Sequence, residues 1–361
     1  MFSSIKVSGY KGIVDLSLYK IPRILLIGGR NNVGKSSLLE AIFLALDRMN
    51  PELLARHFSF RGATAIQLTP DAMWRPAFHN YNLSEPIEIE LCDSRSKVLI
   101  VKVRHDPNYT AYNIQQPAVT PQESAKSITS SSGSALQSLH ITATYDKKQV
   151  LDAHLTIQGQ GIVFQVKHAE GMAGGGVYIS STARSSPRDD AVRFGQLDLA
   201  NKAEQILSIV QLVEPRISKL SVIAIGDGAE IHADVEGFPR KIPISLMGDG
   251  VGRILSISLS ILVTTGGVVL VDEVENGLHH SKLPDLWTAI TKACIAANCQ
   301  LIATTHNYEC LSAASKSIAP IDPSCFSYVR LDRSKKTGQL AVVQYTGDEL
   351  SAALEAEFEV R

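Results

Sequence analysis

A glycine-rich loop between an apolar strand and a helix is the feature that most constrains the fold of this chain. Residues 24–27 read Ile-Leu-Leu-Ile, and residues 29–36 read Gly-Arg-Asn-Asn-Val-Gly-Lys-Ser. The pattern G-x-x-x-x-G-K-[ST] after a strand is typical of a phosphate-binding loop. The helix that we expect over residues 35–46 directs the positive end of its dipole at the same point. The sequence therefore predicts a site for a nucleoside triphosphate.

Each residue of this loop has an expected part in binding the phosphates. Glycine at Gly29 and Gly34 lets the backbone bend its N–H groups around phosphate oxygens. Lys35 is expected to reach the β- and γ-phosphates, and Ser36 to offer its hydroxyl to Mg²⁺. The other expected nucleotide contacts are Asn31, Asn32, Val33 and Ser37. We therefore predict ATP and Mg²⁺ as the cofactors.

Two acidic residues follow a second apolar run. Residues 268–271 read Val-Val-Leu-Val, and Asp272 and Glu273 come next. Such a run predicts a buried parallel strand, and ligands bind at the carboxyl ends of these strands. Asp272 is the expected Mg²⁺ ligand, directly or through water. Glu273 is expected to orient or deprotonate the attacking water.

A histidine follows the next expected strand, residues 301–304. Because parallel strands end at one edge of the sheet, His306 is expected beside Lys35 and Glu273, where an imidazole can sense the γ-phosphate. Lys35, Glu273 and His306 are the predicted catalytic residues. We interpret His279 and His280 as loop residues that flank the site.

The remaining pattern predicts an α/β fold, with a parallel sheet flanked by helices. A β-rich part precedes an alternating β/α part. We expect an N-terminal antiparallel β subdomain and a β-rich insertion in addition to the ATPase core. The expected division is 1–60 and 191–330 for the two parts of the core, 61–190 for a β-rich segment with a flexible insertion, and 331–361 for a C-terminal hairpin and helix.

Several local predictions complete this outline. A Ser-rich stretch, 124–134, and a Gly/Ser/Arg-rich stretch, 171–188, are expected to be mobile surface loops. One helix is expected over residues 196–213, and Pro215 stops it. A Gly-rich turn is expected before a helix that begins at Ile254.

Composition is that of an ordinary globular protein. The 361 residues carry a net charge of -1, so no strongly basic field attracts nucleic acid. The five cysteines form no C-x-x-C pair and no zinc-finger spacing, and we interpret them as idle thiols in a reducing compartment. The longest apolar stretch, residues 254–271, is interrupted by Ser, Thr and Gly. We expect a cytoplasmic protein without export or a membrane span.

The motifs together resemble the ABC-type ATPases of the SMC, RecF and OLD group, and more narrowly the compact bacterial AAA-family proteins. No coiled-coil arm or TOPRIM nuclease domain fits this sequence. The resemblance rests on blocks that occur in order at 5–13 with 28–42, 243–257 with 268–280, and 301–311. It implies an ABC-type head in which Asp272 and Glu273 are the Walker B pair, 275–279 the D-loop, and His306 the switch histidine. It also implies that Lys11 lies near the phosphates.

The turn at residues 247–251 resembles the signature motif, which in this family acts on the γ-phosphate of the partner subunit. The resemblance implies a homodimer, or a larger oligomer, that sandwiches ATP against Gly248, Asp249 and Gly250. Many relatives carry serine where Gly248 stands, so backbone N–H groups would replace one side-chain contact here. Gln67 is a candidate for the Q-loop glutamine. Arg253 is either structural or reaches the nucleotide across the dimer.

The leading functional hypothesis is an ATP hydrolase whose nucleotide-driven dimerisation controls a separate effector, a nuclease or toxin, in a prokaryotic anti-phage complex. This rests on analogy with compact relatives. The first alternative is a RecF-like repair ATPase that binds DNA, although the basic residues of the insertion region are interspersed with acids. These residues are Lys126, Arg184, Arg188, Lys202, Arg216, Lys219 and Arg240. The second alternative is a scaffold that binds ATP with slow turnover, which Gly248 favours and Glu273 opposes.

Overall fold

The computed structural model describes most of the chain. The described residues are 1–50, 70–109, 138–158, 161–170, 175–181, 186–226, 228–334, 338–358 and 360. The Ser-rich stretch 124–134, Gln67, Lys126 and Arg184 lie outside them, so the structure says nothing of these predictions.

The central element is a six-stranded sheet in the order β16-β15-β3-β14-β13-β9. Its strands are β3 (Ile24–Gly29), β9 (Gly176–Ile179), β13 (Val268–Val271), β14 (Gln300–Thr304), β15 (Phe326–Arg333) and β16 (Leu340–Thr346). All neighbouring pairs are parallel except β15 with β16. Strands β3, β13 and β14 are buried along their whole length, as their unbroken apolar sequences predict.

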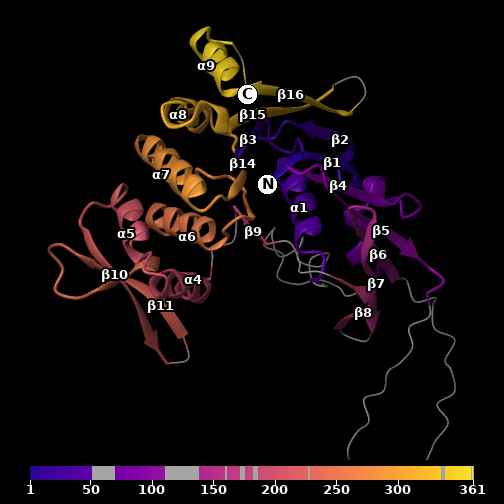
Figure 1. The fold of residues 1–361 in the computed structure, drawn as a ribbon, viewed down its shortest axis with the longest axis horizontal. Helices are drawn as coiled ribbons and strands as arrows, with labels where there is room; N and C mark the ends of the chain where they lie inside the picture. The colour runs from indigo at the N-terminus through magenta and orange to yellow at the C-terminus, as the bar shows by residue number, and fades with distance from the viewer. Residues whose placement is uncertain are drawn as a thin grey trace, which may run out of the picture.

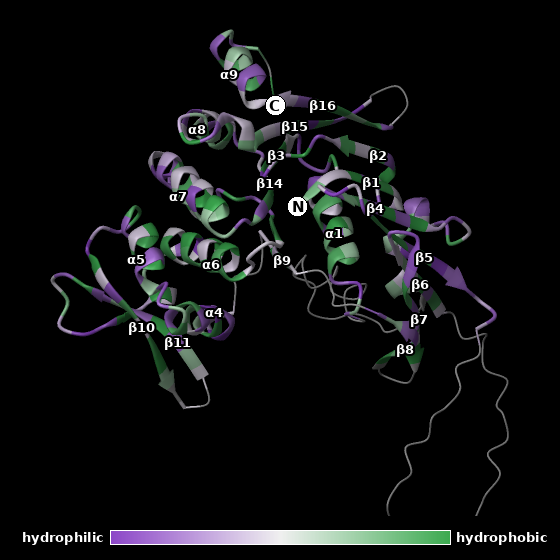
Figure 2. Ribbon diagram, viewed as in Figure 1, coloured by the Kyte–Doolittle hydropathy of each residue, from purple (hydrophilic) through white to green (hydrophobic). Residues whose placement is uncertain are grey.

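Helices cover both faces of this sheet (Figure 1). One face packs against α1 (Lys35–Leu46), and the other against α6 (Asp249–Val263), α7 (Leu283–Ala296) and α8 (Tyr308–Ile318). Successive side chains of β3 point to opposite faces of the sheet. Leu25 and Ile27 pack in the core on the α1 side, and Ile24 and Leu26 pack in the core on the α6 side. Figure 2 shows α1 and α6 as largely hydrophobic. The predicted parallel sheet with flanking helices is therefore confirmed.

A seven-stranded antiparallel sheet packs on the far side of α1, in the order β2-β1-β4-β5-β6-β7-β8. Its strands are β1 (Phe2–Tyr10), β2 (Ile13–Tyr19), β4 (Ile87–Asp93), β5 (Val98–Asp106), β6 (Ser138–Tyr145), β7 (Lys148–Gln158) and β8 (Gly161–Ala169). The N-terminal β subdomain and the β-rich insertion, which we expected as separate parts, thus share one sheet through the pairing of β1 with β4. Three short helices precede β4, namely α3 (Pro70–Trp74), η1 (Arg75–Ala77) and η2 (His79–Tyr81).

A smaller lobe packs on α6. It contains α4 (Pro187–Leu199), α5 (Ala203–Gln211), β10 (Ile217–Ile225), β11 (Gly228–Val235), β12 (Ile242–Pro243) and η3 (Ile244–Leu246). Two short 3-10 helices, η4 (His280–Lys282) and η5 (Pro323–Cys325), precede α7 and β15. The chain ends in the predicted hairpin, β15 with β16, and α9 (Gly347–Glu355), which a capping box at Thr346 and Glu349 begins.

Three local predictions are wrong. The single helix expected over 196–213 is two helices, since Asn201 adopts a left-handed conformation with φ 57° between α4 and α5. The Gly-rich turn is shorter than expected, because Gly248 with φ 94° is the N-cap and α6 begins at Asp249. The stretch 171–188 is not merely a surface loop: Gly176–Ile179 is strand β9, which pairs with β13.

Candidate functional site

The phosphate loop links β3 to α1 in the conformation that its sequence predicts. Gly29 and Gly34 have φ of 131° and 121°, which side-chain-bearing residues rarely adopt. A Cβ at Gly29 would also lie 2.2 Å from the carbonyl oxygen of Leu331. Helix α1 has Gly34 as its N-cap and no side-chain cap among the described residues. Its first N–H groups are therefore available to an anion.

The Lys35 side chain is held within this loop. Its Nζ donates to the carbonyl oxygens of Gly29, at 2.7 Å, and Arg30, at 3.0 Å. Burial lowers the pKa of the Lys35 ammonium, and the carboxylates that follow β13 act in the opposite direction. A bound phosphate would offer this ammonium charged acceptors in place of neutral carbonyls.

Lys11 lies in the turn between β1 and β2 and forms an ion pair with Glu40 of α1. Both side chains are largely buried, at 11% and 3% exposure. Glu40 stands one helical turn beyond Ser36, so Lys11 is close to the start of α1 but is engaged by a carboxylate in this structure. Its predicted contact with phosphate remains a proposal.

Asp272 is the centre of a cluster of hydroxyl groups. Its Oδ1 accepts from Ser36 Oγ, at 3.1 Å, and from Thr304 Oγ1, at 2.6 Å. Its Oδ2 accepts from Ser181 Oγ, at 3.3 Å. The carboxylate predicted to hold Mg²⁺ thus lies against the predicted hydroxyl ligand. Hydroxyl and carboxylate oxygens are the hard donors that Mg²⁺ prefers.

Glu273 occupies an unusual backbone conformation, with φ 48°. A left-handed conformation at a non-glycine residue costs roughly 1–3 kcal/mol and recurs at functional sites. Two contacts hold it, since Thr304 Oγ1 accepts from the Glu273 N–H at 2.8 Å and Arg253 donates to the Glu273 carbonyl at 3.1 Å. The Glu273 carboxylate is 36% exposed and can therefore meet a ligand from solvent.

His306 lies beside Glu273, as the strand order predicts. Its Nδ1 is 3.3 Å from Glu273 Oε1 and 3.6 Å from Glu275 Oε1. Glu275 is nearly buried, and its Oε1 accepts from Thr305 Oγ1, at 2.7 Å, and from the His306 N–H, at 3.2 Å. Glu275 therefore fixes the backbone that carries His306, while the imidazole itself is 46% exposed.

Arg253 has a structural role within the chain, because its partly buried guanidinium bonds to three backbone carbonyl groups. It donates to the carbonyl oxygens of Ser180, Asp272 and Glu273, at 2.8, 2.6 and 3.1 Å. Burial lowers the pKa of this guanidinium, although an arginine stays charged. Arg253 ties the end of β9 to the end of β13 and holds the two acids in position.

Replacing Arg253 with methionine is expected to lower the free energy of unfolding by about 3 kcal/mol, because three partly buried carbonyl groups lose a charged donor. The measurement is urea unfolding followed by circular dichroism. Arg216→Met is the matched control, since Arg216 is 58% exposed and pairs with Glu214 on the surface, where such pairs contribute about 0–1 kcal/mol. Equal stability of the two variants would contradict the assigned role of Arg253.

The signature turn lies on a different helix from the phosphate loop. Gly248, Asp249 and Gly250 begin α6, which packs on the opposite face of the central sheet from α1. The D-loop packs against this helix start, and a Cβ at Gly277 would lie 2.8 Å from the Cβ of Asp249. A cavity of about 360 Å³ opens beside the turn, and Gly248, Arg253 and Asn276 are among its lining residues.

Several residues at the site were not predicted as functional from the sequence. Ser181 was missed because it follows β9, in a stretch that we expected to be a loop. Thr304 ends β14 and Thr305 follows it directly before His306, so their position at the sheet edge was a usable signal. Glu275 was expected only as part of the D-loop, and its burial depends on packing that the sequence does not display.

The chain has the features of a P-loop nucleotide-binding protein of the ATPase class. It has a parallel sheet and a phosphate loop, bent at its glycines, that precedes a helix. Two acidic residues and a histidine follow adjacent strands of the sheet. Comparison of the sequence with protein families agrees. Residues 24–312 match the family described as "AAA domain, putative AbiEii toxin, Type IV TA system", and the chain belongs to that family. This confirms the resemblance to compact AAA-family ATPases.

The individual proteins that resemble this chain share little sequence identity with it. A curated protein of Helicobacter pylori (strain ATCC 700392 / 26695), named "ATP/GTP phosphatase", is 21% identical over 349 residues, which cover 89% of this chain and 90% of that protein. A crystal structure of an Smc head bound to the C-winged helix domain of ScpA is 11% identical, with a TM-score of 0.48 and coverage of 98% and 99%. The SMC head domain from Thermotoga maritima is 13% identical, with a TM-score of 0.41 and coverage of 95% and 98%. Three-dimensional similarity at this level is loose, so the family assignment rests on the sequence match.

Among the described residues, no helix has both the length and the apolar character that a bilayer crossing requires.

Proposed function

We propose that this chain is a Mg²⁺-dependent ATP hydrolase whose site is completed by a second copy of the chain. The observation that carries the proposal is the meeting of three elements at one sheet edge. Ser36 of the phosphate loop lies against Asp272, and Asp272 is followed directly by Glu273, which contacts His306. The family match and the name of the Helicobacter relative support nucleotide hydrolysis.

In this proposal Ser36 and Asp272 hold the metal ion, and Ser181 and Thr304 orient the Asp272 carboxylate by donating to its oxygens. Bound Mg²⁺ neutralises charge on the β- and γ-phosphates. Lys35 leaves its loop carbonyls and donates to the same phosphates, while the N–H groups at the start of α1 bind the remaining oxygens.

Glu273 is the proposed base for the attacking water. Its carboxylate is partly exposed, and its backbone is fixed by Thr304 and Arg253, so the carboxylate is held in one position. His306 contacts that carboxylate, and its imidazole can also form a hydrogen bond with the γ-phosphate. The pair thereby positions the water for in-line attack and senses the state of the γ-phosphate.

The proposed dimer follows from the position of the signature turn. The backbone N–H groups at a helix start can bind an anion, and α6 begins at Asp249 after Gly248, an N-cap that forms no side-chain cap hydrogen bond. Because α6 and the phosphate-loop helix α1 pack on opposite faces of the sheet, we assign the turn to the γ-phosphate of a second chain. ATP then joins two copies, and hydrolysis releases them.

Gly252→Glu is expected to abolish ATP-dependent dimerisation and to lower hydrolysis by about 100-fold or more, because it sets a carboxylate against the incoming phosphate. A Cβ at Gly252 would meet no heavy atom of the described structure within 4 Å, and an acidic residue suits the first turn of a helix. The isolated chain should therefore fold normally. Light scattering and phosphate release are the measurements.

Gly195→Glu is the matched control, since it makes the same substitution in α4, where a Cβ also meets no heavy atom of the described structure within 4 Å. Gly195→Glu should dimerise with ATP and hydrolyse it normally. Unchanged turnover in Gly252→Glu would show that the signature turn does not meet nucleotide.

The output of the cycle is assigned to another protein. We propose that dimerisation switches a separate effector, a nuclease or toxin, in a cytoplasmic prokaryotic defence complex, and the family description, which names a toxin–antitoxin system, supports this context. Five free cysteines suit a reducing compartment. Stimulation of turnover by DNA would instead favour the repair alternative.

A further inference from the structure

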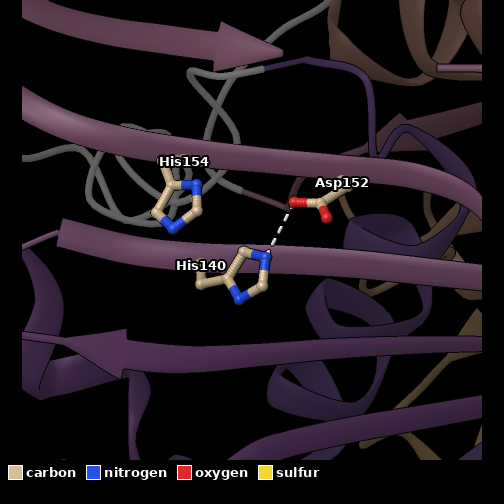
Figure 3. A group of neighbouring side chains, drawn as sticks. All are labelled: His140, Asp152 and His154. Atoms are coloured by element: carbon tan, nitrogen blue, oxygen red, sulfur yellow. Dashed lines mark hydrogen bonds and ion pairs between the residues drawn. The ribbon is translucent and has the colours of Figure 1, made fainter. Parts of the chain in front are cut away.

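Two histidines and an aspartate form a compact group on the antiparallel sheet, on the face away from α1 (Figure 3). His140 lies on β6 directly opposite His154 on β7, and Asp152 precedes His154 by two residues on the same face. One ligand atom from each of the three residues lies within 4.8 Å of the other two. Within the described parts of the chain this is the one such group of three or more His, Cys, Asp or Glu residues.

His154 has an unsatisfied nitrogen in this group. Its Nε2 is 3.4 Å from Asp106 Oδ2, and a hydrogen bond there requires the proton on Nε2. Its Nδ1 is buried and has no hydrogen-bond partner among the described residues, and the side chain is only 3% exposed. The ring is stacked between Tyr109 and His140, at centroid distances of 3.8 and 4.3 Å. A fixed, buried imidazole thus presents a bare lone pair.

The charge state of these side chains suits a cation. Burial lowers the pKa of His154, and the neighbouring His140 and Lys167 lower it further, which favours the neutral ring. Burial raises the pKa of Asp152, but the hydrogen bonds from His140 and Gln149 and the charge of Lys167 together act more strongly in the opposite direction, so the net shift favours the ionised carboxylate. Neutral imidazole and ionised carboxylate are the forms that bind metals.

His140 supplies the third ligand atom. Its Nε2 is 2.8 Å from Asp152 Oδ1, while its Nδ1 accepts from Arg104 Nε and Nη2, at 2.9 and 2.7 Å. A proton therefore lies between His140 and Asp152, at the position that a metal ion would take. Arg104 is exposed, so it can turn aside when the proton moves to Nδ1.

We propose that His140, Asp152 and His154 form a binding site for a divalent transition-metal ion of the zinc class. Zinc bonds to nitrogen and oxygen ligands of about 2.0–2.2 Å imply ligand atoms about 3.3 Å apart, so the group closes with small side-chain movements. Asp106 is the outer carboxylate that fixes the tautomer of His154, a contact typical of histidine ligands.

Three protein ligands leave a fourth position for water. Asp152 is 26% exposed, so this position opens toward solvent at the Asp152 side of the group. The ion joins β6 to β7, and those strands pack through their other face on the core that contains α1. The site is separate from the Asp272 cluster, and the ATPase proposal does not depend on it.

The test is a zinc titration of the whole chain by calorimetry, without nucleotide or Mg²⁺. Wild type is expected to bind one Zn²⁺ per chain. His154→Ala and Asp152→Asn should each weaken this binding by more than about 100-fold, because loss of outer partners alone costs about 10–100-fold. Asp106→Ala should weaken zinc binding by about 10–100-fold, because Asp106 is an outer partner of His154. Co²⁺ binding should give visible absorption bands in wild type but not in His154→Ala or Asp152→Asn.

His168→Ala is the matched control, since His168 lies on the adjacent strand β8 but outside the group, and its side chain is 41% exposed. It should bind zinc as wild type does. Circular dichroism of the metal-free variants checks folding, and Asp152→Asn keeps the test valid if His154→Ala unfolds. Absence of stoichiometric zinc in wild type, or equal affinity in wild type, Asp152→Asn and His154→Ala, would overturn the proposal.

Discussion

Glu273→Gln is expected to slow ATP hydrolysis by about 10²–10⁴-fold, the range that a positioned general base contributes. ATP binding should survive, because glutamine has the same shape and keeps the contacts of the Glu273 backbone with Thr304 and Arg253. Phosphate release measures the loss, and calorimetry with ATP measures the retained binding. The variant should accumulate as an ATP-bound dimer, since assembly continues while hydrolysis does not.

Glu204→Gln is the matched control for this substitution, because Glu204 is exposed in the first turn of α5, away from the central sheet edge. It should hydrolyse ATP as wild type does. Full turnover in Glu273→Gln would assign the base to another residue, and loss of ATP binding would mean that Glu273 acts on the structure of the loop.

Lys35→Ala is expected to have the second large effect. The ammonium is the cation of the phosphate loop, and a charged hydrogen bond of about 1.5–3 kcal/mol corresponds to roughly 10–100-fold weaker ATP binding. Turnover should fall further, by about 10²–10³-fold, because the same group stabilises charge that develops in the transition state. Calorimetry and phosphate release separate these two effects.

Without ATP, Lys35 also bonds to the loop carbonyls of Gly29 and Arg30, so the variant needs a folding check by thermal melting. Lys6→Ala is the control, because Lys6 is exposed on β1 of the antiparallel sheet. Wild-type ATP affinity in a folded Lys35→Ala chain would contradict the assignment of the phosphate loop.

The parts of the fold that the sequence predicted are those with a local pattern. The phosphate loop and α1 follow from glycine spacing and a continuous apolar run, and β13 and β14 follow from short apolar strands that end in polar residues. The meeting of Asp272, Glu273 and His306 could be predicted because neighbouring parallel strands end at one edge.

The parts that the sequence did not predict depend on distant partners. Strand β9 has only four residues beside glycine-rich sequence, and its pairing with β13 makes it a strand. Arg253 reaches three carbonyl groups from two other segments, which no spacing encodes. Likewise, the proximity of His140 to Asp152 and His154 exists only through the register of β6 with β7.

Mixing two inactive variants tests the completion of the ATP site by a second copy most directly. Lys35→Ala loses the phosphate-loop half of a site, and Gly252→Glu loses the signature half. If each site combines the loop of one chain with the signature turn of its partner, equimolar mixing restores one intact site in every mixed dimer. A mixed dimer has one intact site of two, so phosphate release per chain is expected to reach about a quarter of the wild-type level with random pairing and up to about half if only mixed dimers form. The shared site would be contradicted if light scattering detects mixed dimers but ATP hydrolysis stays at the level of the separate variants.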